Sequence, residues 1–117
     1  MGLFERSDFD KLLGQLPGVT LVDQWDARVA KVGGKVFCLL SDHDPLRLVF
    51  KCGEGSFDIL TALGGVSQAA YFAKRQWVSV QQDAPLSHDD LIAYVGRSHG
   101  LIAAGLTRKL RTELGIT

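Results

Sequence analysis

The feature that most constrains this chain is a change of hydrophobic period, from helical spacing to alternation, at residue 28. Alternating runs at 28–32 and 35–40 flank Gly33-Gly34, and a two-glycine link of this kind is typical of a tight β-hairpin. The turn-forming segment Asp42-His43-Asp44-Pro45 then separates the hairpin from a further strand-like run at 46–52. These residues predict three consecutive antiparallel strands.

Helical spacing predicts a helix before and after these strands. Ser7 can cap the first helix, which Pro17-Gly18 ends. Ser87 can cap the last helix, which runs to Leu106 and beyond. Glycines within the last helix predict a kink or a close contact there; they are Gly96, Gly100 and Gly105. The apolar stripes of the two helices are Phe9, Leu12, Leu13 and Leu16, and Leu91, Tyr94, Val95, Leu101, Ile102 and Leu106.

Shorter elements complete the expected fold. They are a strand at 19–22, a short helix capped by Ser56 and a strand at 75–81 that carries Trp77. The fold class is therefore α+β, an antiparallel β-sheet with helices packed on one face. With 117 residues, 46% of them hydrophobic and 22% charged, the chain has the size and composition of a single domain over 1–117.

Counting the register from the Gly33-Gly34 turn assigns each strand side chain to one of two faces. The count pairs Ala30 with Phe37, and Phe37 with Phe50. One face is apolar and is expected to lie under the helices: Ala30, Phe37, Leu39, Leu48, Phe50 and Cys52. The other face mixes cations with short apolar side chains and has no acid: Val29, Lys31, Val36, Cys38, Arg47, Val49 and Lys51. A chain of zero net charge is thus predicted to present a basic open face.

This basic face is the leading candidate for function, as a non-enzymatic binding module. We expect phosphate contacts, and hence DNA binding, from Lys31, Arg47 and Lys51, with Lys74 and Arg75 adding to them. Two alternative roles for this face stay open. A protein–protein adaptor or a homodimer could use the apolar side chains of the same face, namely its valines and Cys38. Alternatively, the cations serve only to keep the exposed face of the sheet soluble.

No catalytic, metal or cofactor site is predicted. Gly96-Arg97-Ser98-His99-Gly100 matches the G-x-S-x-G motif of hydrolases, but its neighbours have helical period where that motif needs a strand and a sharp turn. Asp42-His43-Asp44 has no His or Cys partner at ligand spacing. Gly53-Glu54-Gly55-Ser56 lacks the lysine of a phosphate loop. Trp25 and Trp77 could stack on bases, but a Trp in an apolar strand is more often a core residue.

The location is expected to be cytoplasmic, with no membrane partner. The longest apolar runs fall far short of the ~18 residues that span a bilayer. The opening segment Met1-Gly2-Leu3-Phe4-Glu5-Arg6 lacks the charged-then-apolar order of a signal peptide. Cys38 and Cys52 fit this location, because both lie in apolar strand-like runs where a free thiol behaves as a small hydrophobe.

Several segments, taken in order, resemble the MmcQ/YjbR-like family. The segments that carry the likeness are Leu16-Pro17-Gly18-Val19, Trp25, residues 31–37, residues 48–52 with the family's "L-x-x-K" pattern, Lys74-Arg75-Gln76-Trp77 with its "N-K-x-x-W" block, and the last helix from Leu91 through Ser98-His99 to Leu106. The order and spacing of these segments, rather than any one of them, make the likeness specific. It extends from about residue 16 to residue 111.

The resemblance implies a CyaY-like (frataxin-like) sandwich, with helices on one face of an antiparallel sheet, and a DNA-binding role suggested by a double-wing-like arrangement. Two departures affect any role of the family's polar groups. Tyr71 and Ala73 stand where the family often has His and Asn, and its Ser-Tyr is Ser98-His99 here. Iron handling, by analogy with frataxin folds, would need an acidic ridge on the first helix, where the acids are sparse: Glu5, Asp8 and Asp10.

Overall fold

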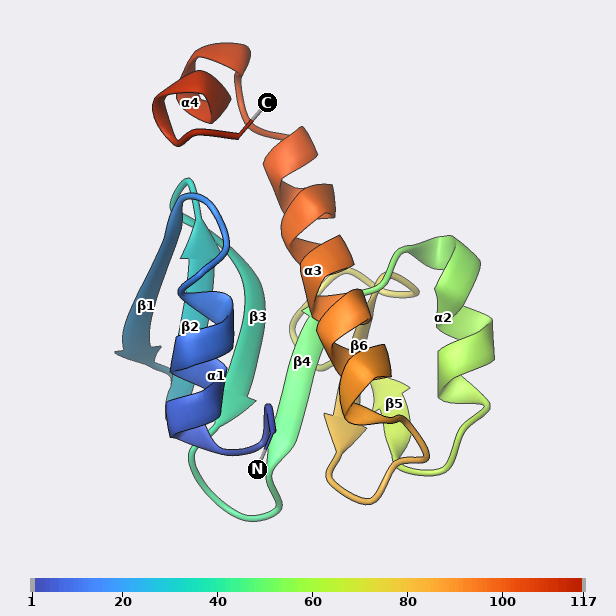
Figure 1. Cartoon of the computed structure of the whole chain (residues 1–117). Helices are drawn as coiled ribbons and strands as arrows, with labels where there is room; N and C mark the ends of the chain where they lie inside the picture. The colour runs from blue at the N-terminus through green and yellow to red at the C-terminus, as the bar shows by residue number, and fades with distance from the viewer. Residues whose placement is uncertain (1, 117) are drawn as a thin grey trace.

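Six antiparallel strands form one sheet, in the order β1-β2-β3-β4-β6-β5 (Figure 1). The computed structural model describes residues 2–116. The first strands along the chain are β1 (Val19–Gln24), β2 (Ala27–Val32), β3 (Lys35–Ser41) and β4 (Arg47–Lys51). The remaining two are β5 (Val66–Gln68), at the far edge, and β6 (Trp77–Gln81), which pairs with β4. The strand expected at 19–22 is confirmed, whereas β5 has no counterpart in the sequence prediction.

The helices that cover the sheet lie on one of its faces (Figure 1). They are α1 (Arg6–Leu13), which lies over β2, α2 (Glu54–Thr61), which packs beside β5 and β6, and α3 (His88–Ala104), which crosses β3 and β4. Phe9, Leu60 and Val95, one from each helix, are fully buried in a single hydrophobic core with the inner face of the sheet. The predicted fold class is confirmed.

A β-bulge at Phe37 changes the predicted register of β3. Ala30 pairs with Cys38 instead of Phe37, and Phe50 also pairs with Cys38 instead of Phe37. The two one-residue shifts cancel, so β2 and β4 keep the relative alignment that the sequence predicts. Phe37 and Cys38 both belong to the core under the helices, and Leu39 packs against the cluster on the open face. The assignment of Cys38 to the open face and of Leu39 to the core face is therefore wrong.

The last helix begins where the sequence predicts but is divided. The hydroxyl of Ser87 accepts a hydrogen bond from the Asp90 N–H at 3.0 Å, and the Asp90 carboxylate accepts one from the Ser87 N–H at 3.1 Å. α3 then ends at Ala104 with Gly105 as its C-cap, and Thr107 caps a separate helix, α4 (Arg108–Glu113). The prediction of one continuous helix is wrong, and the expected kink takes the form of a helix break at the last of its glycines.

The first two helices begin earlier than their serines predict. The N-cap residues are Glu5 for α1 and Gly53 for α2, so the predictions of Ser7 and Ser56 as caps are wrong. Ser56 lies inside α2, where its buried hydroxyl accepts a hydrogen bond from Arg97 of α3 at 3.1 Å. The serine therefore joins two helices instead of starting one.

Both thiols and the helix lengths agree with the sequence analysis. Cys38 and Cys52 are buried and free, and burial raises the pKa of each thiol. Over residues 2–116, no helix combines the length and the hydrophobicity needed to cross a bilayer.

Candidate functional site

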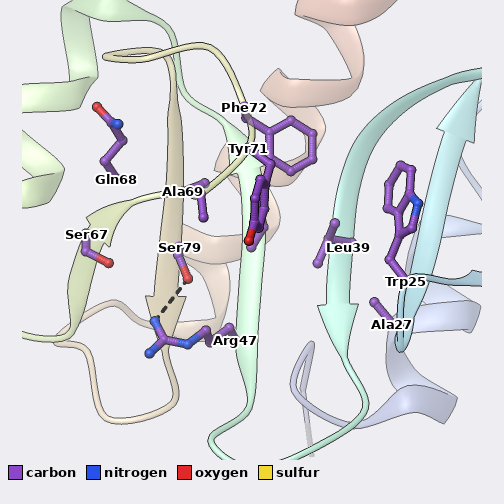
Figure 2. A pocket seen from close by; sticks show the side chains of 12 residues that line it. Trp25, Ala27, Leu39, Arg47, Ser67, Gln68, Ala69, Tyr71, Phe72 and Ser79 are labelled. Carbon is purple, nitrogen blue, oxygen red and sulfur yellow. Dashed lines mark hydrogen bonds between the residues drawn. The ribbon is translucent and has the colours of Figure 1, made fainter.

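The face of the sheet opposite the helices is hollowed by a cleft of about 740 Å³ (Figure 2). Its floor consists of apolar side chains from three adjacent strands, namely Ala27, Leu39 and Val49. The segment that joins β5 to β6 forms one side, and Trp25, at the tip of the β1–β2 hairpin, lies on the other. The volume falls within the ~300–1,000 Å³ range of small-molecule sites. The complete lining is Trp25, Ala27, Leu39, Arg47, Val49, Ser67, Gln68, Ala69, Ala70, Tyr71, Phe72 and Ser79.

The segment between β5 and β6 is fixed to the sheet by an aromatic stack. Phe72 lies on Trp77 of β6, with ring centroids 4.2 Å apart and ring planes at 23°. The N–H of Ala69 donates to the Trp77 carbonyl at 3.1 Å. Ala69, Trp77 and Val49 form a second, smaller hydrophobic cluster. The burial of Trp77 is confirmed, but a loop on the open face covers it rather than a helix.

Two aromatic residues at the rim of the cleft have left-handed backbone conformations. Trp25 has a φ of +57° and is 62% exposed, and Tyr71 has a φ of +69° and is fully exposed. This region costs roughly 1–2 kcal/mol for residues other than glycine. Tyr71 offsets none of that cost by burial, because its ring lies in water. Strain of this kind concentrates at functional sites, and both rings are positioned to offer flat apolar surface to a ligand.

Arg47 is the only charged residue among the described residues that line the cleft. Its backbone N–H donates to Ser41 Oγ at 2.8 Å, and its guanidinium Nη1 donates to Ser79 Oγ on β6 at 3.3 Å (Figure 2). No carboxylate within residues 2–116 forms an ion pair with it. A guanidinium has five N–H donors in one plane, so most of those of Arg47 remain for a ligand. An arginine with no counter-charge in an apolar cleft suits a phosphate or a carboxylate.

The three cations predicted for the open face do share it. Lys31 on β2 and Arg47 and Lys51 on β4 follow the alternation of their strands and are half-buried. None of the three has a carboxylate partner in the described part of the chain. Lys51 is four residues from Arg47 along β4, or about 13 Å. Only Arg47 therefore reaches the cleft, and the two lysines lie toward the other end of the face.

The two further cations of the predicted site, Lys74 and Arg75, have different surroundings. Lys74 is exposed in the turn before β6. Arg75 turns toward α2, where its guanidinium donates to the Asp58 carboxylate at 2.9 Å and lies 5.4 Å from the ring centroid of Phe57. Arg75 is thus engaged with the helical layer, and of this pair only the exposed Lys74 remains available to a ligand.

Sequence reasoning names Trp25 as a residue that could stack on bases, but it misses the roles of Tyr71 and Phe72 and the cleft that the three residues share. Trp25 and Tyr71-Phe72 lie in segments with no hydrophobic period, which the sequence assigns to connections. Their signal is a large aromatic side chain among turn-forming or polar neighbours, as in Asp23-Gln24-Trp25-Asp26. An aromatic residue in such a segment contributes little to a core and more often to a surface site.

The G-x-S-x-G segment lies within α3 and packs against the sheet. Ser98 is fully buried; its hydroxyl donates to the Phe37 carbonyl and accepts from the Lys51 N–H at 2.9 Å. The His99 ring packs edge-on against Phe37, and its Nε2 lies 2.8 Å from the Pro17 carbonyl oxygen. Both side chains hold α3 to its neighbours and neither faces the cleft.

The acids of the first helix are dispersed. The Asp10 carboxylate pairs with Arg28 at 2.9 Å, and Asp8 accepts a hydrogen bond from the Gly2 N–H at 2.8 Å. Across residues 2–116, no group of three or more His, Cys, Asp or Glu side chains could hold a metal ion.

Comparison with known proteins gives the fold and the family. A Deinococcus radiodurans protein with a DUF419 domain superposes with a TM-score of 0.84 at 24% identity, covering 95% of this chain and 88% of that one. A Pseudomonas syringae protein superposes with a TM-score of 0.69 at 18% identity, covering 83% and 97%. No curated protein matches the chain. The YjbR family model matches residues 14–101, a span that includes the whole cleft lining, and the chain belongs to the YjbR family.

Proposed function

We propose that this protein is a non-enzymatic binding module that holds single-stranded nucleic acid, with DNA as the expected ligand, on the open face of its sheet. One observation carries the proposal: the exposed rings of Trp25 and Tyr71 share a cleft with the guanidinium of Arg47, which has no counter-charge. Proteins bind single strands by stacking bases on aromatic rings and contacting phosphates with cations.

The aromatic rim favours a single strand over a duplex. Stacking of a base on an aromatic side chain is worth ~1–3 kcal/mol. In a duplex the base faces are already stacked on one another, so Trp25 and Tyr71 could reach them only after unstacking, which costs a few kcal/mol. A bare basic sheet would contact phosphates alone and would not discriminate in this way.

The cleft lining supports binding rather than chemistry. Among the described residues, it contains no histidine, cysteine or carboxylate, the side chains that most often act as acid, base or nucleophile. The proposal includes a cytoplasmic location, where Cys38 and Cys52 would stay reduced. It also includes membership of the CyaY-like sandwiches.

Binding is expected to depend on local charge, because the whole chain is neutral. Lys31, Arg47, Lys51 and Lys74 could together supply about three or four phosphate contacts to a strand that crosses the face. Each contact with a single strand contributes a slope of ~0.7 to the dependence of log K on log salt. The affinity should therefore fall about 20–50-fold between roughly 50 and 200 mM salt.

The experiment is a fluorescence-anisotropy titration with a labelled oligonucleotide, single-stranded or in a duplex, at those two salt concentrations. We expect single strands to bind more tightly than duplex, and Lys31→Ala or Lys51→Ala to lower the salt slope by about 0.7 each. Lys11→Ala, which removes an exposed cation from α1 in the helical layer, is the matched control and should change nothing. Absence of binding at the lower salt, or equal affinity for duplex, would overturn the proposal.

Exposure of the same two rings also supports a second candidate, a protein–protein or homodimer surface. Three of the apolar side chains expected to form such a surface are buried, namely Val29, Cys38 and Val49. Self-association through this face would therefore have to use Trp25 and Tyr71, together with the half-buried Val36. Light scattering after size-exclusion chromatography tests this: a dimer that Trp25→Ser dissociates supports it, and a monomer at all concentrations counts against it.

A further inference from the structure

We infer that the cleft is a subsite for one unstacked nucleotide, whose base contacts the rings of Trp25 and Tyr71 and whose phosphate binds Arg47. This inference rests on the proposed function and deepens it. The proposed function concerns the whole open face, whereas the subsite concerns what the cleft itself selects. The shared chemistry is a planar base joined to a phosphate, supplied either by a free nucleotide or by one unit of a strand.

The cleft has an aromatic end and a cationic end. In Figure 2 the Tyr71 ring stands at one end of the floor, and Arg47 with Ser79 occupies the other. Leu39 lies between the Tyr71 and Trp25 rings in Figure 2, and the floor side chains Leu39 and Val49 have no hydrogen-bonding atoms. A ligand that fills the cleft therefore needs a flat apolar part, a spacer and an anionic group, in that order.

A nucleotide has these three parts, and other ligand classes fit less well. A cation is disfavoured because Arg47 is the only charged lining residue within the described chain. A flexible acyl chain gains no stacking from Trp25 and Tyr71, whereas a base gains ~1–3 kcal/mol from each ring that it meets. A phosphate presents several oxygens to the planar donors of a guanidinium.

Ser79 is a positioning residue for Arg47. Its side chain is buried and accepts the Nη1 hydrogen bond at 3.3 Å, which fixes the direction of the guanidinium. Ser79→Ala should weaken the binding of a nucleotide by about threefold to tenfold. It should leave the binding of the corresponding nucleoside unchanged, because the nucleoside has no phosphate for Arg47 to hold. A purely structural role for Ser79 would weaken both ligands alike.

The test compares thymidine 5′-monophosphate, thymidine and benzoate as ligands of the full chain, read by tryptophan fluorescence. The nucleotide should quench the emission and bind about 10–100-fold more tightly than thymidine, as expected for a charge-assisted phosphate contact. Arg47→Gln should remove the difference between the two ligands, while Lys11→Gln should keep it. Trp25→Phe should lose the quenching, because Trp77 is buried under Phe72. Far-UV circular dichroism and the urea midpoint verify that Arg47→Gln is folded.

The outcomes separate this inference from the proposed function. Equal affinities for thymidine and its monophosphate, or benzoate binding as tightly as the nucleotide, would overturn the nucleotide subsite. If oligonucleotides bind but the mononucleotide neither binds nor competes, the subsite is wrong and the proposed function stands. If the mononucleotide binds and no oligonucleotide does, the subsite stands as a site for free nucleotides and the proposed function is wrong.

Discussion

The buried hydroxyl of Ser98 on α3 donates a hydrogen bond to the backbone carbonyl of Phe37 on β3. Phe37 is the extra residue of the β-bulge, so the regular β2–β3 ladder supplies no partner for it. The same hydroxyl accepts a hydrogen bond from the N–H of Lys51 on β4 at 2.9 Å. One serine therefore joins the helical layer to two strands at the point where the sheet is irregular.

Ser98→Ala should lower the free energy of unfolding by about 2–3 kcal/mol, because it leaves a buried carbonyl and a partly buried N–H of the backbone without partners. Urea unfolding followed by circular dichroism measures the loss. Ser67→Ala is the matched control, since Ser67 is exposed on the edge strand β5, and it should change stability by less than about 0.5 kcal/mol. Similar decreases in the free energy of unfolding for both variants would show that the two hydrogen bonds of Ser98 do not stabilise the fold.

Tyr71→Gly should separate binding from stability. Glycine adopts a φ of +69° without steric strain, and the fully exposed ring buries no surface that could be lost. We expect the free energy of unfolding to stay level or rise by about 0.5–1 kcal/mol. The affinity for a single-stranded oligonucleotide should fall at least about fivefold, as one stacking contact disappears.

Tyr71→Phe is the control for this variant, because it keeps the ring and should bind like the wild type. Urea unfolding and anisotropy titration give the two measurements. If Tyr71→Gly lowers the free energy of unfolding by more than about 1 kcal/mol, the Tyr71 ring stabilises the loop by more than its left-handed backbone costs, and the prediction is wrong.

Alanine should be tolerated unequally at the two glycines of the β2–β3 hairpin. Gly33 and Gly34 have φ angles of +59° and +81°, so alanine is strained by roughly 1 kcal/mol at either position. A Cβ on Gly33 would lie 2.7 Å from a methyl carbon of Leu106, whereas one on Gly34 has no neighbour within 4 Å. Gly33→Ala should therefore cost about 1 kcal/mol more than Gly34→Ala in urea unfolding. Equal costs would mean that Leu106 moves aside freely.

Cys38 should make the fold less stable in alkaline solution. Burial raises the pKa of its thiol, so the native state keeps the proton that the unfolded state loses above about pH 8.5. The unfolded state then binds fewer protons than the native state, and the free energy of unfolding falls by up to ~1.4 kcal/mol per pH unit. Urea unfolding at about pH 7, 9 and 10 should give a flatter pH dependence for Cys38→Ala. Parallel curves for the two proteins would contradict this.

The fold was predictable where local patterns decide it. The Gly33-Gly34 turn and the Ser87 cap agree with the structure because each is set by neighbours in sequence. The bulge at Phe37 was not predictable, because an extra residue in a strand gives no signal in the local sequence. The Phe37 carbonyl is instead bonded by Ser98, which lies 61 residues away along the chain. The helix break after Ala104 is hidden in the sequence because Thr107 caps α4 within an apparently continuous apolar stripe.

The charges of the site were predictable, and Trp25 could be named as a stacking residue, but the cleft itself could not be predicted. Arg47 and the two lysines on the same face, Lys31 and Lys51, follow from strand alternation, which a count of residues reproduces. The cleft depends on the segment between β5 and β6 folding back over the open face, where Phe72 stacks on Trp77. That contact is tertiary, and Tyr71 and Trp25 owe their positions to left-handed turns of non-glycine residues. Neither the Phe72–Trp77 contact nor the left-handed turns can be read from the hydrophobic periodicity of the sequence.

Amide and indole chemical-shift mapping by NMR tests the central claim most directly, since it locates the ligand on the molecule. A short oligothymidine should shift the Trp25 indole signal, the amides of Ala69–Phe72 and those of Arg47 and Ser79, and leave α1 and α4 unchanged. The shifts should shrink as salt is raised. Shifts confined to the helical layer, or none at low salt, would contradict the account.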